Sequence, residues 1–371
     1  MKSAKRILFL LVFTSLTSLT LISPAQATTV IFLTEPTHRQ LDGAFVDDDL
    51  ATLLSYNGTL GSKIFNPIAG SRIWQIDPAL IDEVQSMTEP YLLSDGTKGA
   101  GTTAAQIWLE RLKSVTRYDQ IIAAPYGNPS GYWLRKLLPH DESYFLTVGA
   151  EKLQTFFGRP VSVSITFPTN SQFRLNNLVY ESFLEAKKII AATASYMSSA
   201  ELEKYRLRTT AVLNPYLAPA RRDFLARDTT ANTFALSHMI RVASSKFTVT
   251  SEKQLLPITI INDFVGEAKI KIYVSSLNSK VITQSLPEEV SIAGRSKVQI
   301  KIPVQVVTSG ESEIMIKVRN QQGALLSEPT IFPLKLSVIS PIATWVTTGA
   351  AITLFAAAII QSARRIRRKR T

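Results

Sequence analysis

The sequence predicts an incomplete or degenerate α/β barrel-like domain, then a membrane-proximal immunoglobulin-like β-sandwich and a single C-terminal transmembrane helix. Three patterns predict this fold class. Short β-type runs alternate with helical patterns in the N-terminal two-thirds, strict apolar and polar alternation follows, and an uncharged apolar run precedes an arginine-rich end. The prediction divides the chain into five parts: a signal peptide (1–27), the barrel-like domain (28–245), the sandwich (246–340), the transmembrane helix (341–361) and a basic tail (362–371).

The first segment has the pattern of a secretory signal peptide. Basic residues (Lys2, Lys5 and Arg6) precede an uncharged apolar run at 7–22, and Ala25-Gln26-Ala27 has the small residues of a cleavage site. An uncleaved N-terminal anchor is the alternative, which the shortness of the run disfavours.

The last segment has the pattern of a membrane span. Residues 342–360 carry no charge, Trp345 stands near their start, and a cationic cluster follows at 364–370. Such clusters stay in the cytoplasm, so we expect a single-pass type I protein of the cell membrane, with the lipid bilayer as a partner. A buried core helix is the alternative.

Charge and cysteine content exclude several classes of function. The net charge of +12 comes largely from the two terminal segments, which leaves the ectodomain close to neutral and gives no basis for nucleic-acid binding. The chain has no cysteine, which excludes disulfides and cysteine-ligated metals. His38, His140 and His238 lack the spacing of metal ligands, so we expect no metal and no cofactor.

The elements of the barrel-like domain follow from local patterns. Pro36 stops the first β-type run, Asp47-Asp48-Asp49 resembles a helix N-terminus more than a metal site, and Asp77-Pro78 turns a strand into a helix. Strands are predicted at 29–34, 71–76, 120–124, 161–167, 189–193 and 210–214, with helices between them and at 234–243. They predict a parallel sheet, either open or closed into a barrel. The ligand-binding edge would lie at the carboxyl ends of its strands, at Glu35, Asp77, Asn128, Thr169 and Asn214.

Beyond residue 246 the period changes to two. Val298, Ile300, Ile302 and Val304 alternate with polar residues, as in half-buried antiparallel strands. Strands are predicted at 256–261, 268–274, 296–304, 313–318 and 331–338. Turn residues between these runs favour the sandwich.

Several short motifs resemble an uncharacterised family of actinobacterial envelope proteins. They are Trp74-x-Ile76-Asp77-Pro78-Ala79-Leu80-Ile81-Asp82-Glu83, Leu41-Asp42-Gly43, Asp47-Asp48-x-Leu50-Ala51, Ala124-Pro125-Tyr126 and Leu256-Pro257-Ile258-Thr259-x-x-Asn262-Asp263. The resemblance covers most of the chain from about Val30 and implies the same order of segments. This family tends to have an acid after the third strand, where this chain has Asn128.

Two acids are candidates for catalysis. Glu35 and Asp77 stand at predicted strand ends, and glycoside hydrolysis uses such a pair of carboxyl groups. Asp77 also suits the helix N-cap, and both roles can hold. Predicted ligand-binding residues are Trp74, Tyr126, Asn128 and Asn214, and Tyr132 and Trp133 are further aromatic candidates for stacking on sugars.

These features predict a membrane-anchored extracytoplasmic binding or scaffolding protein of the bacterial cell envelope. Its partner would be peptidoglycan or another wall glycan, or an envelope membrane protein. The alternative is a cell-wall glycan-processing hydrolase that uses Glu35 and Asp77. Neither a serine nucleophile motif nor a phosphate-binding glycine loop is present, so the balance favours a protein that is not an enzyme.

Overall fold

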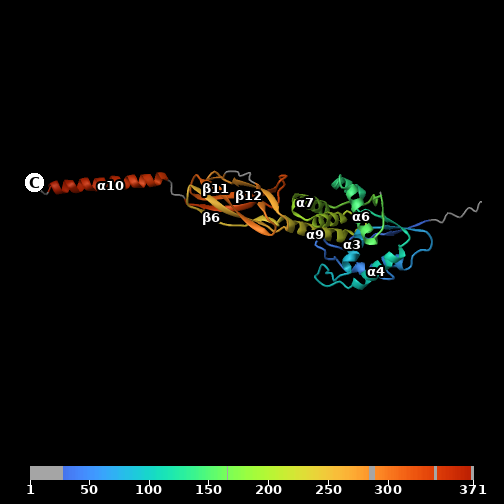
Figure 1. Cartoon of the computed structure of the whole chain (residues 1–371). Helices are drawn as coiled ribbons and strands as arrows, with labels where there is room; N and C mark the ends of the chain where they lie inside the picture. Colours follow the sequence, from blue (N-terminus) through green and yellow to red (C-terminus); the bar gives the residue numbers. More distant parts are fainter. Residues whose placement is uncertain (1–27, 165, 284–288, 338–340, 369–371) are drawn as a thin grey trace, which may run out of the picture.

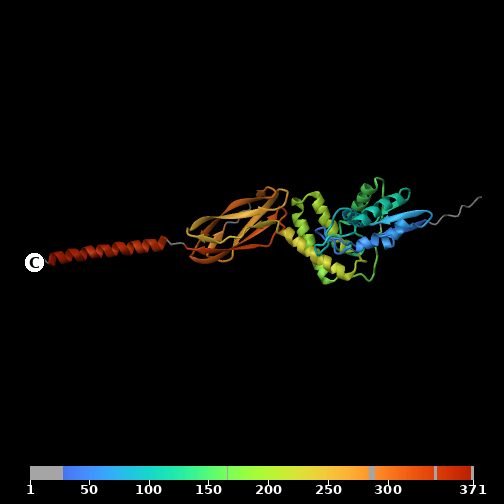
Figure 2. The same ribbon diagram turned by 90° about the horizontal axis from the view of Figure 1, so that it is seen from below.

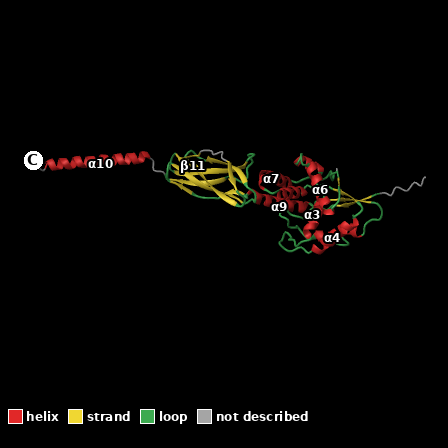
Figure 3. Cartoon of the chain, in the orientation of Figure 1, coloured by secondary structure: helices red, strands yellow, loops and turns green. Residues whose placement is uncertain are grey.

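The computed structural model describes residues 28–164, 166–283, 289–337 and 341–368. It has a mixed head (residues 28–239), two curled sheets, and the C-terminal helix α10 (Pro341–Arg368), which follow one another along an extended molecule (Figure 1). Colouring by secondary structure separates the mainly helical head from the sheets (Figure 3). The predicted signal peptide and the last residues of the basic tail, 369–371, lie outside the described residues.

The head contains one four-stranded parallel sheet in the order β1-β2-β3-β4. Its strands are β1 (Thr29–Leu33), β2 (Arg72–Ile76), β3 (Gln120–Ala123) and β4 (Ser162–Val163). The order begins at β1 and ends at β4, so the sheet is open and the predicted α/β barrel is wrong. The run predicted as a strand at 189–193 continues a helix, and the run at 210–214 forms a helix end and turn, because tertiary packing overrides the β preference of their branched residues.

Helices cover one face of this sheet and build the rest of the head. They are α1 (Asp49–Leu54), α2 (Thr59–Phe65), α3 (Pro78–Met87), α4 (Thr102–Val115), α5 (Gly131–Leu137), α6 (Glu142–Phe157), α7 (Asn177–Thr193), the short 3₁₀ helix η1 (Ala194–Tyr196), α8 (Ser199–Ala211) and α9 (Pro219–Ser237). Leu33, Trp74 and Ile76 are fully buried beneath helices, whereas Val30 and Phe32 on the other face are 42% and 51% exposed.

Two curled sheets follow the head and form a sandwich-like unit. The five-stranded sheet has the order β10-β8-β12-β13-β6, and the four-stranded sheet has the order β5-β7-β11-β9. The strands are β5 (Ile240–Val242), β6 (Phe247–Val249), β7 (Lys253–Asn262), β8 (Ala268–Ser276), β9 (Val281–Thr283), β10 (Glu289–Ile292), β11 (Ser296–Val306), β12 (Gly310–Asn320) and β13 (Thr330–Leu336).

Five predicted strands coincide with β7, β8, β11, β12 and β13. The predicted immunoglobulin-like sandwich is corrected to two curled sheets that form a sandwich-like unit. Within these two sheets β6 pairs in parallel with β13, and the other strand pairs are antiparallel. Strand β5 lies inside the helix predicted at 234–243, because α9 ends at Ser237 and the chain then joins the four-stranded sheet.

The head and the sandwich share one hydrophobic core. Ile190 of α7 and Tyr196 of η1 belong to the same buried cluster as Ile258 of β7 and its neighbours. Two hydrogen bonds also join them: the Tyr196 hydroxyl donates to the Lys269 carbonyl at 3.0 Å, and Asn320 Nδ2 donates to the Ala192 carbonyl at 3.0 Å. The rotated view shows α7, α9 and the sandwich in direct succession (Figure 2).

Helix α10 contains the apolar stretch that the sequence predicted. Its segment Trp345–Ser362 has a mean hydropathy of 1.4 and is long and apolar enough to cross a membrane. Large apolar side chains on it, such as Leu354 and Phe355, are 73% and 70% exposed. The structure thus confirms the prediction of an apolar C-terminal helix that is long enough to cross a membrane.

Candidate functional site

Asp77 is a buried helix cap at the end of β2. Its Oδ1 accepts hydrogen bonds from the backbone N–H groups of Ala79 and Gly127, each at 2.9 Å. These bonds start α3 and hold the turn after β3 against the end of β2. The side chain has no solvent exposure, and burial raises the pKa of its carboxyl group to about 7. The structure therefore has the cap that the Asp-Pro pair predicted.

Glu35 faces a different group of residues. Its Oε1 lies 3.7 Å from His38 Nε2, just beyond the end of β1. His38 is itself buried and contacts Asp47 and Arg221. The two acids predicted as a catalytic pair thus engage separate partners. Oδ1 of Asp77 accepts two backbone amides, whereas its buried Oδ2 has no hydrogen-bond partner among the described residues.

The side chains of Trp74 and Asn214, both predicted to bind a ligand, are buried and hydrogen-bonded within the head. Trp74 is fully buried, and its Nε1 donates to Asp119 Oδ2 at 2.8 Å. Asn214 is 2% exposed, and its Nδ2 donates to the Gly127 carbonyl at 3.1 Å. Asn128 adopts a positive φ of 48° in the same turn, a conformation that asparagine tolerates better than most residues. These three residues support the edge of the sheet rather than an exposed binding surface.

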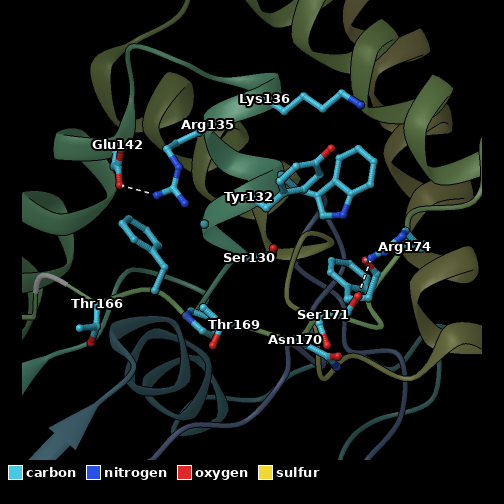
Figure 4. A pocket seen from close by; sticks show the side chains of 15 residues that line it. Ser130, Tyr132, Arg135, Lys136, Glu142, Thr166, Thr169, Asn170, Ser171 and Arg174 are labelled. Carbon is cyan, nitrogen blue, oxygen red and sulfur yellow. Dashed lines mark hydrogen bonds and ion pairs between the residues drawn. The ribbon is translucent and has the colours of Figure 1, made fainter.

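A large hollow of the head lies beside α5, just beyond the turn that contains Asn128. We call it the groove: a cavity of about 860 Å³ between α5 and the 166–174 segment. Figure 4 shows Tyr132, Arg135 and Lys136 on the α5 side, and Thr169 and Asn170 on the other. Of the aromatic candidates for sugar stacking, Tyr132 and Trp133 line it.

Aromatic rings and cations line much of the groove. Tyr132 is 62% exposed and meets Trp133 edge to face, with ring centroids 5.2 Å apart. Lys136 Nζ lies 4.9 Å from the centroid of the Trp133 ring. Phe167 and Phe173 add further apolar surface. A flat ligand with apolar faces would find stacking surfaces here.

The groove has more positive than negative charge. Its one lining acid, Glu142, is paired with Arg135 at 3.1 Å. Arg174 Nη1 donates to the backbone carbonyls of Ser171 and Phe173, which leaves its charge without a carboxylate among the described residues. Lys136 likewise forms no ion pair with any residue that the structure describes. The groove therefore favours anionic ligands.

The indole N–H of Trp133 is a buried donor. The side chain is 8% exposed, and its Nε1 has no hydrogen-bond partner among the described residues. The core residue Trp108 has an Nε1 in the same state, so this donor does not by itself mark a ligand site.

Residues far along the chain hold the groove in shape. Arg222 of α9 lies with its guanidinium 4.4 Å from the centroid of the Phe173 ring. The same guanidinium donates to the carbonyls of Val212, Asn214 and Leu217. Sequence reasoning identified Tyr132, Trp133 and Thr169 but missed Phe173 and Arg174, because no local pattern marks the loop that carries them.

Three comparisons place the chain among known proteins. A family model described as a family of unknown function, DUF6049, matches residues 169–371. No curated protein matches. The solved structures that match include WR4, a C. elegans MSP family member (15% identity, TM-score 0.21, covering 26% of this chain and 97% of that one). They also include Salmonella alpha-2-macroglobulin reacted with methylamine (15% identity, TM-score 0.22, 26% of this chain) and the E. coli chaperone DraB (14% identity, TM-score 0.20, 26% of this chain).

These structural likenesses are confined to about a quarter of this chain and carry no argument about its activity. The matched part spans 7% of the macroglobulin and 53% of the chaperone. The family match confirms the expected resemblance to an uncharacterised family. The actinobacterial origin stays a prediction. Because the family model covers more than half of the sequence, the chain belongs to the DUF6049 family of unknown function.

Proposed function

We propose that this protein is a membrane-anchored extracytoplasmic binding protein of the bacterial cell envelope, whose groove binds an anionic wall glycan. The observation that carries the proposal is the groove wall, where exposed Tyr132 stands beside Trp133 and the unpaired cations Lys136 and Arg174. The apolar face of a sugar ring stacks on aromatic side chains, and carboxylate or phosphate substituents pair with Lys and Arg.

The topology of the chain supports an anchored location. Helix α10 would cross the bilayer once, with Arg364 and Arg365 near its cytoplasmic end. The predicted signal peptide would export the head and the sandwich. The sandwich then separates the groove from the bilayer, which suits contact with the wall.

Binding has more support than hydrolysis. A glycosidase holds two carboxyl groups across the bond that it cleaves. Asp77 is fully buried and accepts two backbone hydrogen bonds, and Glu35 interacts with His38. The groove's single acid, Glu142, is occupied by Arg135. The hydrolase alternative has no comparable observation in its favour.

The test is a wall-binding assay with the full chain in detergent. Purified cell wall is incubated with the wild type, with Tyr132→Ala, and with Tyr118→Ala as a matched control, since Tyr118 is 91% exposed and lies outside the groove. We expect Tyr132→Ala to weaken binding by about fivefold, because an aromatic stacking contact contributes about 1 kcal/mol. Tyr118→Ala should bind as the wild type does.

A second arm tests the charge of the ligand. Chemical removal of the anionic polymers from the wall should weaken binding to a similar extent, and Lys136→Gln should reproduce part of that loss. Equal binding by the Tyr132→Ala and Tyr118→Ala variants, or undiminished binding to the stripped, neutral wall, would contradict the proposal.

A further inference from the structure

A second hollow lies at the carboxyl end of the parallel sheet. We call it the cleft: a cavity of about 370 Å³ lined by residues that follow β1 and β3 and by α3, α6 and α8. Tyr126, predicted as a ligand-binding residue, lines it after β3. In open parallel sheets, ligands bind outside the carboxyl ends of the strands. The volume falls within the range of small-molecule sites.

Three cations of the cleft have no acidic partner among the described residues. Arg39 donates to the Ser86 hydroxyl and to the Gly43 carbonyl. Arg208 Nη1 donates to the Leu41 carbonyl at 3.1 Å, and Lys204 Nζ reaches the Asp42 carbonyl at 3.5 Å. All of these acceptors are neutral oxygens, so none of the three cations forms an ion pair among the described residues. Carboxylates farther away still attract them: Glu83 and Asp82 raise the pKa of Arg39, and Asp42 and Glu201 raise that of Lys204, against the lowering by burial and by the other cations.

The three cations also repel one another. Burial lowers the pKa of Arg39, and the nearby charge of Arg208 lowers it further. Burial likewise lowers the pKa of Lys204, with additional lowering by Arg208 and Arg39. Like charges gathered in a partly desolvated site raise the free energy of the empty protein, and an anion between them would remove that cost.

The acids of the cleft are already occupied. Lys152 Nζ bridges Asp82 Oδ2 at 3.3 Å and Glu203 Oε1 at 3.0 Å. Glu83 accepts hydrogen bonds from the Thr37 hydroxyl and the His38 backbone N–H. Asp82 also accepts the hydroxyl of Tyr126 at 3.0 Å. The three acids thus interact with Lys152 or with neutral donors, and none forms an ion pair with Arg39, Lys204 or Arg208 among the described residues.

We infer that the cleft binds a small phosphate-bearing ligand through Arg39, Lys204 and Arg208. Three converging cations match the multiple charge of a tetrahedral phosphate, whereas one guanidinium suffices for a planar carboxylate. This site is separate from the glycan groove, because the two cavities share no lining residue. The inference therefore does not depend on whether the groove binds glycan.

The test is calorimetric titration of the full chain in detergent at low ionic strength, with inorganic phosphate and glycerol phosphate as probes and acetate as the carboxylate comparator. We expect Lys204→Gln to raise the dissociation constant for phosphate at least tenfold. Among the described residues, Lys204 makes a long contact with the Asp42 carbonyl and lies 5.6 Å from the centroid of the Tyr205 ring, so this variant should keep its fold. Arg208→Gln should show a larger loss, with its circular dichroism and melting temperature checked first.

Two matched controls separate this site from other cations. The first is Arg227→Gln, which changes an exposed arginine of α9 outside both the cleft and the groove, and the second is the acetate titration; Arg227→Gln should bind phosphate as the wild type does. Unchanged phosphate affinity in folded Lys204→Gln and Arg208→Gln would overturn the inference. So would acetate binding as tight as that of phosphate, or an equal loss of affinity in Arg227→Gln.

Discussion

Arg221 Nη2 lies 2.6 Å from Asp47 Oδ2, which joins α9 to the loop before α1 across 174 residues of sequence. The same guanidinium contacts His38 Nε2 at 3.1 Å, and His38 Nδ1 lies 3.0 Å from Asp47 Oδ1. The aspartate run therefore does more than begin α1. Asp47 anchors the last helix of the head to its first strand end.

Asp47→Asn should lower the free energy of unfolding by about 1–2 kcal/mol, because Arg221 and His38 lose a charged partner in a partly buried network. Urea denaturation followed by circular dichroism measures the change. Asp49→Asn is the control, since Asp49 is 71% exposed and lies farther from Arg221, at 3.3 Å. Equal effects of the two variants would show that the network adds no stability.

The stability of the head should also depend on the protonation of His38. Burial lowers the pKa of His38, but Glu35, Glu83 and Asp47 together outweigh that effect and the net pKa is raised. The imidazolium form therefore contributes stability that is complete below the unfolded-state pKa of about 6.5 and is lost as the pH rises through the folded-state value. Denaturation between pH 5 and pH 9 should show this loss in the wild type. His38→Gln should remove that part of the pH dependence, and a profile identical to the wild type would contradict the assignment.

Asp77 should add a second pH dependence of the same sign. Its folded-state pKa of about 7 lies above the ordinary aspartate pKa of 3.8, so its contribution is complete below the lower value and is lost as the pH rises through about 7. Asp77→Asn keeps an oxygen acceptor but cannot ionise. Its stability relative to the wild type should therefore improve between pH 4 and pH 8, by about 1.4 kcal/mol for each unit of pKa shift at most.

Asp77→Ala provides the comparison for that variant. It removes the acceptor for the backbone N–H groups of Ala79 and Gly127 and should destabilise the head at every pH, by about 1–2 kcal/mol. A difference between Asp77→Asn and the wild type that stays constant from pH 4 to pH 8 would show that folding does not raise the pKa of Asp77.

The head and the sandwich should unfold together. Tyr196→Phe removes the hydroxyl that donates to the Lys269 carbonyl and should cost about 1 kcal/mol without splitting the transition. Intrinsic fluorescence and circular dichroism should give coincident denaturation curves. Tyr118→Phe, at a 91% exposed position, should have no effect. Two separate transitions in the wild type would contradict a common core.

Membrane integration should depend on the apolar face of α10. Leu354→Arg places a charge in the middle of the span, at a cost of about 3 kcal/mol on insertion scales. We expect more of this variant than of the wild type in the soluble fraction after alkaline extraction of membranes. Leu277→Arg, at a 44% exposed position of the sandwich, is the control and should leave the distribution unchanged.

The sequence predicted best those elements whose pattern is set by local burial. Alternation along β11 predicted its strand because each second side chain faces the core, with Ile302 and Val304 buried and Lys301 exposed. Asp77-Pro78 predicted the start of α3 because the cap needs only neighbouring residues. Isolated apolar runs were ambiguous: the run at 189–193 is part of α7, since it extends the apolar stripe of a helix that packs on the sandwich.

The two binding hollows depend on contacts that no local pattern contains. The cleft brings Arg39 together with Lys204 and Arg208, which lie far along the chain on α8. Phe173 becomes a wall of the groove because Arg222 of α9 supports its ring. Tyr132 and Trp133 could be chosen from the sequence, since adjacent aromatic residues after a strand are visible as a motif.

The common core between α7, η1 and the sandwich also has a mechanical consequence. Ile190 and Tyr196 interlock with the strands, so a pull on a ligand held by the head would load the sandwich directly instead of bending a linker. Head and sandwich together would then respond to such a pull as one unit, and the load would pass through the Tyr196 and Asn320 hydrogen bonds and the apolar contacts between them.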